Sequence, residues 1–164
     1  MRIAGTLAHS LVNGEGWRFV IFTQGCPHHC PGCQNPDTHD SAGGEEMSLD
    51  HLKDLIKEQS QKLTDGVTFS GGDPFFQPAD CAELASYTHS LGLDVWAYTG
   101  WTYEELLKDP KKMGFLKQVN ILVDGPFLMD LKSNSCKFRG STNQRIIDVK
   151  KSLSSGQVIL WDED

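Results

Sequence analysis

Apolar positions along the chain fall into short buried runs separated by longer amphipathic stretches. The short runs are rich in β-branched and aromatic residues, which predicts strands. These predicted strands are Ile3–Leu7, Arg18–Phe22, Val67–Ser70, Asp94–Thr99 and Asn120–Val123. A segment without an assigned element, Arg145–Val149, follows, and then a final strand-like segment, Val158–Trp161.

The longer stretches carry apolar residues at helical spacing and begin next to capping residues. Ser48 is placed to cap a helix from Leu49 to about Lys62. A second helix is expected over Ala79–Ser90, closed by Gly92, and a short third one starts at the capping box of Thr102 and ends before Pro110.

Strands that alternate with helices predict βαβ units, and hence an α/β fold with a mainly parallel sheet. In such sheets ligands bind at the carboxyl ends of the strands. Four polar or glycine-rich segments follow predicted strands and are expected at one rim: Gln24–Cys33, Gly71–Pro74, Thr99–Gly100 and Asp124–Pro126. No linker or internal repeat interrupts the pattern, so a single domain spanning residues 1–164 is expected.

Length and charge narrow the class of protein further. The chain has 164 residues, fewer than the roughly 250 of a complete eight-stranded α/β barrel. No apolar run approaches the roughly 18 residues of a membrane span, and Met1–His9 lacks the layout of a signal peptide. The formal charge of −7 argues against nucleic-acid binding. A cytoplasmic protein without a membrane partner is expected.

Three of the five cysteines, Cys26, Cys30 and Cys33, lie within eight residues directly after a predicted strand. Pro27, Pro31 and Gly32 oppose helix formation and permit a tight loop. Three thiolates on one loop can bind three corners of a [4Fe–4S] cluster and leave the fourth iron without a protein ligand. An open coordination position is typical of a catalytic metal centre.

A zinc site with three cysteines and His28, His29 or His39 is the alternative. Zinc modules more often draw two ligand pairs from separated positions, and this sequence has no second cysteine pair. Cys81 falls on the apolar side of a predicted helix and Cys136 is isolated, as expected of a buried thiol and an incidental exposed one. The spacing therefore favours a cluster over zinc.

The segment Ser70-Gly-Gly-Asp-Pro74 ends a predicted strand at the expected rim. Its two glycines let backbone approach a ligand closely, and Pro74 biases Asp73 toward an extended conformation. Main-chain groups exposed there suit an α-amino and an α-carboxylate group. Taken alone, the segment would be interpreted as an ordinary Gly-Asp-Pro turn.

The cysteine spacing resembles that of the radical S-adenosylmethionine (SAM) superfamily, although Gly32 replaces the usual aromatic residue before the last cysteine. One branch shares this departure: the activating proteins of anaerobic (class III) ribonucleotide reductase. The resemblance runs from about Val12 to Val149. It rests on Asn13-Gly-x-Gly-x-Arg18, Pro31-Gly-Cys33, Ser70–Pro74, Val123-Asp-Gly125 and Arg139–Gln144, in this order. The chain departs from the branch at Glu15-Gly-Trp17 and at Gln34.

The resemblance implies a partial, open βα barrel and two cofactors, a [4Fe–4S] cluster and SAM. Cys26, Cys30 and Cys33 would hold the cluster, and no catalytic residue is implied beyond the cluster and SAM. The implied SAM contacts are Gly32, Cys33, Gln34, Ser70, Gly71, Gly72 and Asp73, with Thr99 and Asp124 as further candidates. No role follows for Arg139–Gln144 or Cys136.

The resemblance also implies a function: SAM is cleaved reductively, and the 5′-deoxyadenosyl radical abstracts a hydrogen atom to leave a glycyl radical on the anaerobic reductase. The implied partners are the large subunit of that reductase and a flavodoxin- or ferredoxin-like electron donor. The alternatives are an activase for another glycyl-radical enzyme, a small-molecule radical-SAM enzyme, and a noncatalytic zinc or iron–sulfur binding module.

Overall fold

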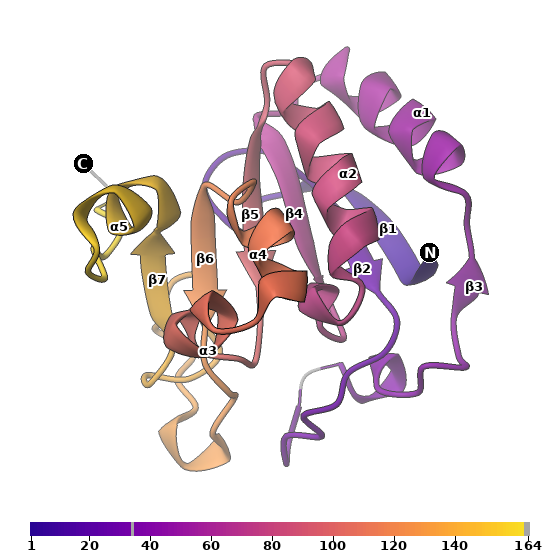
Figure 1. Ribbon diagram of the computed structural model, residues 1–164. Helices are drawn as coiled ribbons and strands as arrows, with labels where there is room; N and C mark the ends of the chain where they lie inside the picture. The colour runs from indigo at the N-terminus through magenta and orange to yellow at the C-terminus, as the bar shows by residue number, and fades with distance from the viewer. Residues whose placement is uncertain (34, 163–164) are drawn as a thin grey trace.

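A mixed β-sheet forms the centre of the protein (Figure 1). The computed structural model describes residues 1–33 and 35–162. Over these residues the sheet has seven strands in the order β3-β1-β2-β4-β5-β6-β7. The strands are β1 (Arg2–Ser10), β2 (Arg18–Thr23), β3 (Glu45–Glu46), β4 (Gly66–Gly71), β5 (Asp94–Tyr98), β6 (Ile121–Asp124) and β7 (Arg145–Asp148).

The four central strands, β2, β4, β5 and β6, are parallel, which confirms the expected α/β class. Strands at both edges are antiparallel: β1 pairs with β2, β3 with β1, and β7 with β6. The short connection between β1 and β2 accounts for one of these pairings, because a parallel neighbour needs a crossover of a dozen or more residues.

Five α-helices lie in the described residues: α1 (Leu49–Ser60), α2 (Pro78–Ser90), α3 (Tyr103–Leu107), α4 (Pro110–Leu116) and α5 (Val149–Ser155). The predicted caps are confirmed, since Ser48 accepts a hydrogen bond from the N–H of His51 and Thr102 from that of Glu105. None of these helices is long and apolar enough to cross a membrane.

Two helices were not expected from the sequence. Pro110, predicted to lie just beyond a helix end, also begins α4, where Asp109 caps the N–H of Lys111. Proline suits the first helical position because a backbone N–H at that position has no partner within the helix, so nothing is lost when proline lacks it. At the C-terminal end, α5 directly follows β7, and the strand-like Val158–Trp161 contributes only an isolated bridge between Leu160 and Ile147.

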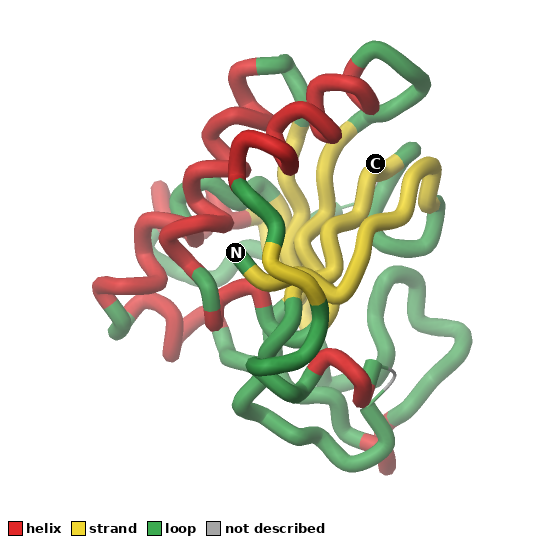
Figure 2. Tube along the Cα trace, turned by 90° about the vertical axis from the view of Figure 1, so that its right-hand side faces the viewer, coloured by secondary structure: helices red, strands yellow, loops and turns green. Residues whose placement is uncertain are grey.

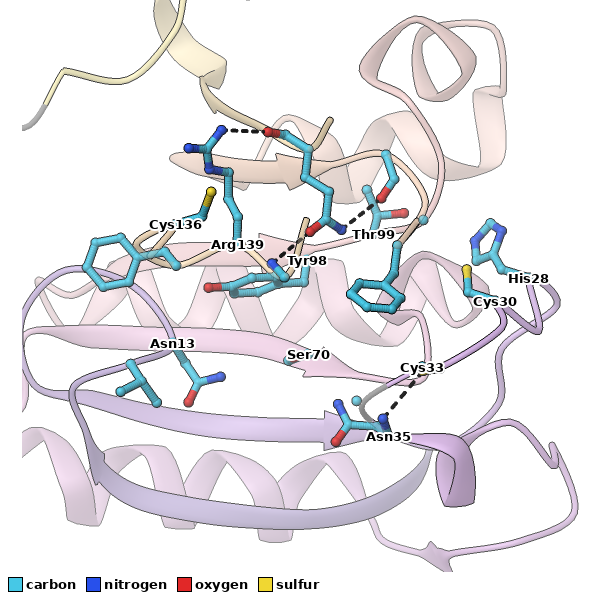
Figure 3. A pocket seen from close by; sticks show the side chains of 18 of the residues that line it. Asn13, His28, Cys30, Cys33, Asn35, Ser70, Tyr98, Thr99, Cys136 and Arg139 are labelled. Carbon is cyan, nitrogen blue, oxygen red and sulfur yellow. Dashed lines mark hydrogen bonds between the residues drawn. The ribbon is translucent and has the colours of Figure 1, made fainter. Parts of the chain in front are cut away.

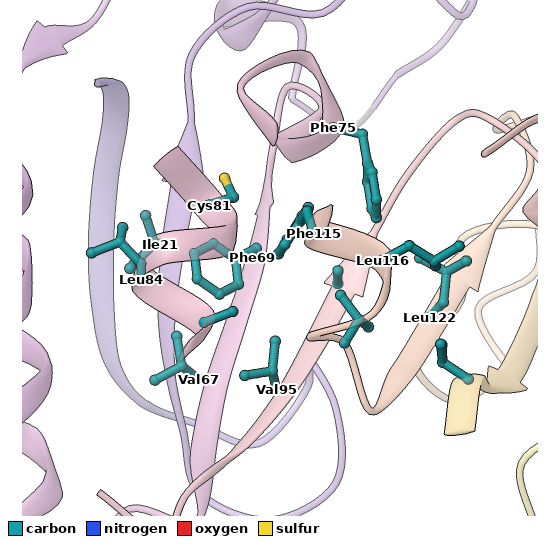
Figure 4. Packing of buried hydrophobic residues seen from close by; sticks show 14 of the residues in the cluster. Ile21, Val67, Phe69, Phe75, Cys81, Leu84, Val95, Phe115, Leu116 and Leu122 are labelled. Carbon is teal, nitrogen blue, oxygen red and sulfur yellow. The ribbon is translucent and has the colours of Figure 1, made fainter. Parts of the chain in front are cut away.

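The helices cover one face of the sheet, and long loops gather at one end of the strands and extend beside the other face (Figure 2). Val67 and Phe69 of β4 and Val95 of β5 point toward the helices and are fully buried against residues such as Phe115 (Figure 4). Side chains at the intervening positions face the opposite side, because successive residues of a strand alternate between faces. This second face, with the loops that border it, carries the candidate site.

Candidate functional site

A cavity of about 620 Å³ lies on the loop-bearing side of the sheet (Figure 3). At one end it is bordered by the cysteine loop, and at the other by the connection between β1 and β2. The residues lining it from the cysteine segment are Cys26, His28, Cys30, Cys33, Asn35 and His39. Those at the strand ends are Ser70, Gly71, Gly72, Tyr98, Thr99 and Gly100. The expected gathering of strand-end segments at one rim is therefore present.

The three cysteines of the loop all line this cavity. Burial raises the pKa of the Cys26 thiol, while hydrogen bonds from the backbone N–H groups of His28 and His29 act to lower that pKa. Cys33 Sγ accepts a hydrogen bond from the N–H of Asn35 at 3.4 Å. Backbone N–H groups directed at sulfur stabilise a thiolate, the form that binds iron.

Three thiols on one loop fit a cluster bound at three corners. Within residues 1–33 and 35–162, no three His, Cys, Asp or Glu side chains are already arranged to hold a single metal ion. The donor set, all soft sulfur, suits iron–sulfur chemistry.

The histidines considered as a fourth zinc ligand differ in their surroundings. His28 Nε2 is 2.7 Å from Asp73 Oδ2 and so has a partner already. His29 is exposed, and its ring contacts the ring of His39 edge to face. His39 lines the cavity, and its buried Nε2 has no hydrogen-bond partner within the described part of the chain.

Gly72, directly after β4, packs closely against the backbone of Gly25 and Thr38, whereas the sequence suggested a close approach to a ligand. A Cβ at Gly72 would overlap the carbonyl oxygen of Gly25 and lie 2.8 Å from that of Thr38. The N–H of Gly72 donates to Thr23 O at 2.8 Å, and that of Asp73 donates to Gly25 O at 2.9 Å. These two N–H groups are therefore already used within the chain.

The two carboxylates among the candidate contacts lie behind the cavity wall. Asp73 is fully buried and its carboxylate accepts hydrogen bonds from neighbouring elements. Asp124 is also buried, and it binds the Arg145 guanidinium and the N–H of Tyr103. Thr99 does line the cavity, although its hydroxyl donates to Asp73 at 2.9 Å.

Gly32 and Gln34 are the remaining candidate SAM contacts. Gly32 has a positive φ of 73° and lies in the loop beside Met129, outside the set of cavity-lining residues. Gln34 falls outside the described residues.

Residues not selected from the sequence complete the cavity. Leu11, Val12 and Asn13 border its far end, and residues 133–140, including Cys136 and Arg139, form a wall. The sequence signals for these walls are the Asn13–Arg18 and Arg139–Gln144 motifs, neither of which by itself predicts a cofactor contact. Tyr98 lies between these walls, and burial raises the pKa of its hydroxyl.

Arg18 holds the β1–β2 connection in place. Its guanidinium is fully buried and donates to Glu15 O at 2.8 Å and to Thr68 Oγ1 at 2.6 Å. The Thr68 hydroxyl in turn donates to Asn13 O at 2.7 Å. The loop that borders the far end of the cavity is therefore tied to β4 through two side chains.

Comparison with known proteins identifies the family. Residues 12–147 match the family described as "4Fe-4S single cluster domain". The chain is 32% identical over 140 residues to the anaerobic ribonucleoside-triphosphate reductase-activating protein of Enterobacteria phage T4, covering 82% of this chain and 86% of the relative. The chain belongs to the family of anaerobic ribonucleoside-triphosphate reductase-activating proteins.

Other similar proteins carry the same name as the phage protein. The activating protein of Escherichia coli (strain K12) is 35% identical over 147 residues, which cover 82% of this chain and 90% of the relative. That of Haemophilus influenzae is 34% identical over 149 residues, covering 83% and 90%. The family match confirms the iron–sulfur cluster predicted from the cysteine spacing.

The fold has a counterpart among solved structures. QueE from Escherichia coli superposes with a TM-score of 0.51 over 62% of this chain and 52% of QueE, at 20% sequence identity. The similarity at this identity concerns the arrangement of strands and helices.

Proposed function

We propose that this protein activates an anaerobic ribonucleoside-triphosphate reductase by generating a glycyl radical on it. The observation that carries the proposal is the convergence of Cys26, Cys30 and Cys33 on one cavity, in a chain of the activating-protein family. When bound, the cluster supplies one electron that cleaves SAM to methionine and a 5′-deoxyadenosyl radical, which takes a hydrogen atom from a glycine of the reductase.

The chain contributes binding and orientation to this chemistry. Cys26, Cys30 and Cys33 would hold the cluster through their thiolates. Ser70, Gly71 and Gly72 line the cavity beside them and would contact SAM, with Thr99 on the neighbouring strand end. Gly32 and Gln34, which flank Cys33, complete the proposed cofactor contacts from the loop.

The length of the cavity supports a macromolecular substrate. It extends from the cysteine loop to Leu11, Val12 and Asn13, and the side chain of Val12 is 75% exposed. A glycine carried on a loop of the reductase would enter at this far end. The sheet would then serve as a partial, open βα barrel whose open side admits that loop.

Several properties of the whole protein belong to the same proposal. Residues 1–164 act as one domain, and the protein works in the cytoplasm without nucleic acid or membrane. Its partners are the large subunit of the reductase and a flavodoxin- or ferredoxin-like electron donor. The net charge of −7 supports the absence of a nucleic-acid partner, because proteins that bind nucleic acid usually carry a basic surface.

Anaerobic mixing tests the function directly. Reconstituted protein, SAM, a reductant and the anaerobic reductase are combined and examined by electron paramagnetic resonance (EPR). A glycine-centred doublet on the reductase is expected, together with one methionine per cleaved SAM. SAM cleavage without a radical on the reductase would point to another substrate, and a colourless zinc protein would exclude the radical chemistry.

The open side is tested by comparing substrates. The whole reductase is expected to be activated far faster than short glycine-containing peptides, because an extended protein surface must position the loop. Equal rates for a free peptide and the reductase would contradict the proposed role of the far end of the cavity.

A further inference from the structure

The Asp73 carboxylate connects three separate elements of the site. It is fully buried at the end of β4. Its Oδ2 accepts hydrogen bonds from His28 Nε2 at 2.7 Å, from the Thr99 hydroxyl at 2.9 Å and from the N–H of Gly100 at 2.8 Å. Its Oδ1 accepts from the N–H of Phe75 at 3.0 Å. Since a carboxylate only accepts hydrogen bonds, the proton between Asp73 and His28 is assigned to His28 Nε2.

The ring of His28 is closely packed against Trp101 and Gly100. It meets the Trp101 ring edge to face with a centroid separation of 4.4 Å. A Cβ at Gly100 would lie 2.5 Å from His28 Cδ2, so a side chain at that position would displace the ring. The His28 side chain is 17% exposed, although it belongs to a loop whose neighbouring residues, Pro27 and His29, are exposed.

His28 lies between two of the cysteines of the loop. The start of the loop is anchored through backbone hydrogen bonds, from Gly25 N–H to Thr38 O and from Asp73 N–H to Gly25 O. The bond from His28 to Asp73 fixes the loop further along, between Cys26 and Cys30. Buried hydrogen bonds to a charged group are among the stronger ones in proteins, which suits a fixed attachment point.

We propose that Asp73 and His28 form a positioning pair that sets the cysteine loop against the ends of β4 and β5. In this role Asp73 does not contact SAM. Its carboxylate fixes the distance between the sulfur ligands and Ser70, Gly71 and Thr99, which face the cavity. The effect on SAM rests on the proposed function, whereas the effect on the loop does not.

Three variants test the pair. His28→Ala removes the bond to Asp73, and His28→Gln restores a side-chain N–H at a similar reach. His29→Asn is the matched control, because His29 is adjacent, exposed and has a positive φ of 49°, which asparagine tolerates. All three keep the cysteines.

The first measurement is amide hydrogen exchange of the cluster-free chains. Amides of residues 26–33 are expected to exchange at least tenfold faster in His28→Ala than in His29→Asn, while amides of β4 are unchanged. His28→Gln is expected near the wild-type rate. Unchanged exchange in His28→Ala would overturn the pair, whether or not the protein activates a reductase.

The second measurement is SAM affinity, read from the change that SAM causes in the EPR spectrum of the reduced cluster. His28→Ala is expected to weaken SAM binding about tenfold, the equivalent of one lost hydrogen bond to a charged group, and His28→Gln to restore most of it. Wild-type affinity in His28→Ala, or a His28→Gln variant as weak as His28→Ala, would refute the positioning role. Wild-type SAM binding and loop exchange with no reductase activation would count against the proposed function alone.

Discussion

The side chain of Met129 lies against the bare backbone of Gly32. A Cβ at Gly32 would overlap Met129 Cε and lie 2.9 Å from Sδ. Gly32 also has a φ of 73°, a conformation that L side chains rarely adopt. Gly32 takes the place of the aromatic residue that usually precedes the last cysteine. Met129, from the segment 126–144, packs against this position.

Replacing Gly32 by alanine should destabilise the protein by about 1–2 kcal/mol, because the left-handed conformation becomes costly. The displacement of Met129 adds to this cost. Urea denaturation of the cluster-free chain measures the change. Gly114→Ala is the control: Gly114 lies within α4 with open space around its Cα, so alanine there should stabilise the protein by up to about 1 kcal/mol. Equal effects of the two variants would contradict the packing of Met129 on Gly32.

Replacing Cys26, Cys30 or Cys33 singly by alanine should abolish both cluster binding and SAM cleavage, since two thiolates leave the cluster short of a ligand. Iron and sulfide content after anaerobic reconstitution, with methionine release, are the measurements. Cys81→Ala should retain both, because Cys81 is fully buried in the helix-covered core. Its cost should be confined to stability, about 1 kcal/mol. SAM turnover by a Cys30→Ala protein would refute the assignment of the ligands.

Replacing Arg18 by methionine should destabilise the protein by about 2–4 kcal/mol, because Thr68 Oγ1 and the carbonyl groups of Glu15 and Val67 lose a buried donor. Asp94→Asn should cost less, since asparagine keeps an oxygen that can accept from the Arg18 guanidinium and the Asp94 side chain is 48% exposed. Thermal and urea unfolding compare the two variants. If Asp94→Asn proved as costly as Arg18→Met, the ion pair rather than the buried hydrogen bonds would be the source of stability.

The pair of Glu104 and Arg145 predicts a pH dependence. Hydrogen bonds from the Arg145 guanidinium lower the pKa of Glu104 below its ordinary value near 4.5. A carboxyl with a lowered folded-state pKa stabilises the protein above the unfolded-state pKa, and this contribution is lost as the pH falls through the folded-state pKa. Glu104→Gln should therefore lower the free energy of unfolding at pH 7, by less than about 1 kcal/mol because the pair is largely exposed.

The same variant should approach wild-type stability as the pH falls through the lowered folded-state pKa of Glu104. Urea denaturation at pH 7 and at acidic pH measures the difference. A difference between Glu104→Gln and wild type that stays constant across this range would show that protonation of Glu104 does not govern it.

Much of the architecture was predictable from local patterns. The buried β-branched runs in β2, β4, β5 and β6 predicted the parallel core of the sheet, and the capping residues Ser48 and Thr102 predicted two helix starts. The antiparallel edges were less predictable, because strand direction depends on how a connection crosses the sheet. The helix α5 is only seven residues long and packs beside β7, so its pattern was too short to separate helix from strand.

The sequence by itself determined the chemistry: three cysteines at cluster spacing on a loop after a strand, and strand ends free of bulky side chains. Only the tertiary structure decided which polar groups remain available to bind a cofactor. Asp73 follows β4 and Asp124 ends β6, and both resemble cofactor contacts in sequence, yet both carboxylates are buried and bound to the chain's own donors. The reason is physical, since a buried charge is stable only when its hydrogen-bonding partners converge on it, and convergence of residues distant in sequence is a property of the folded chain.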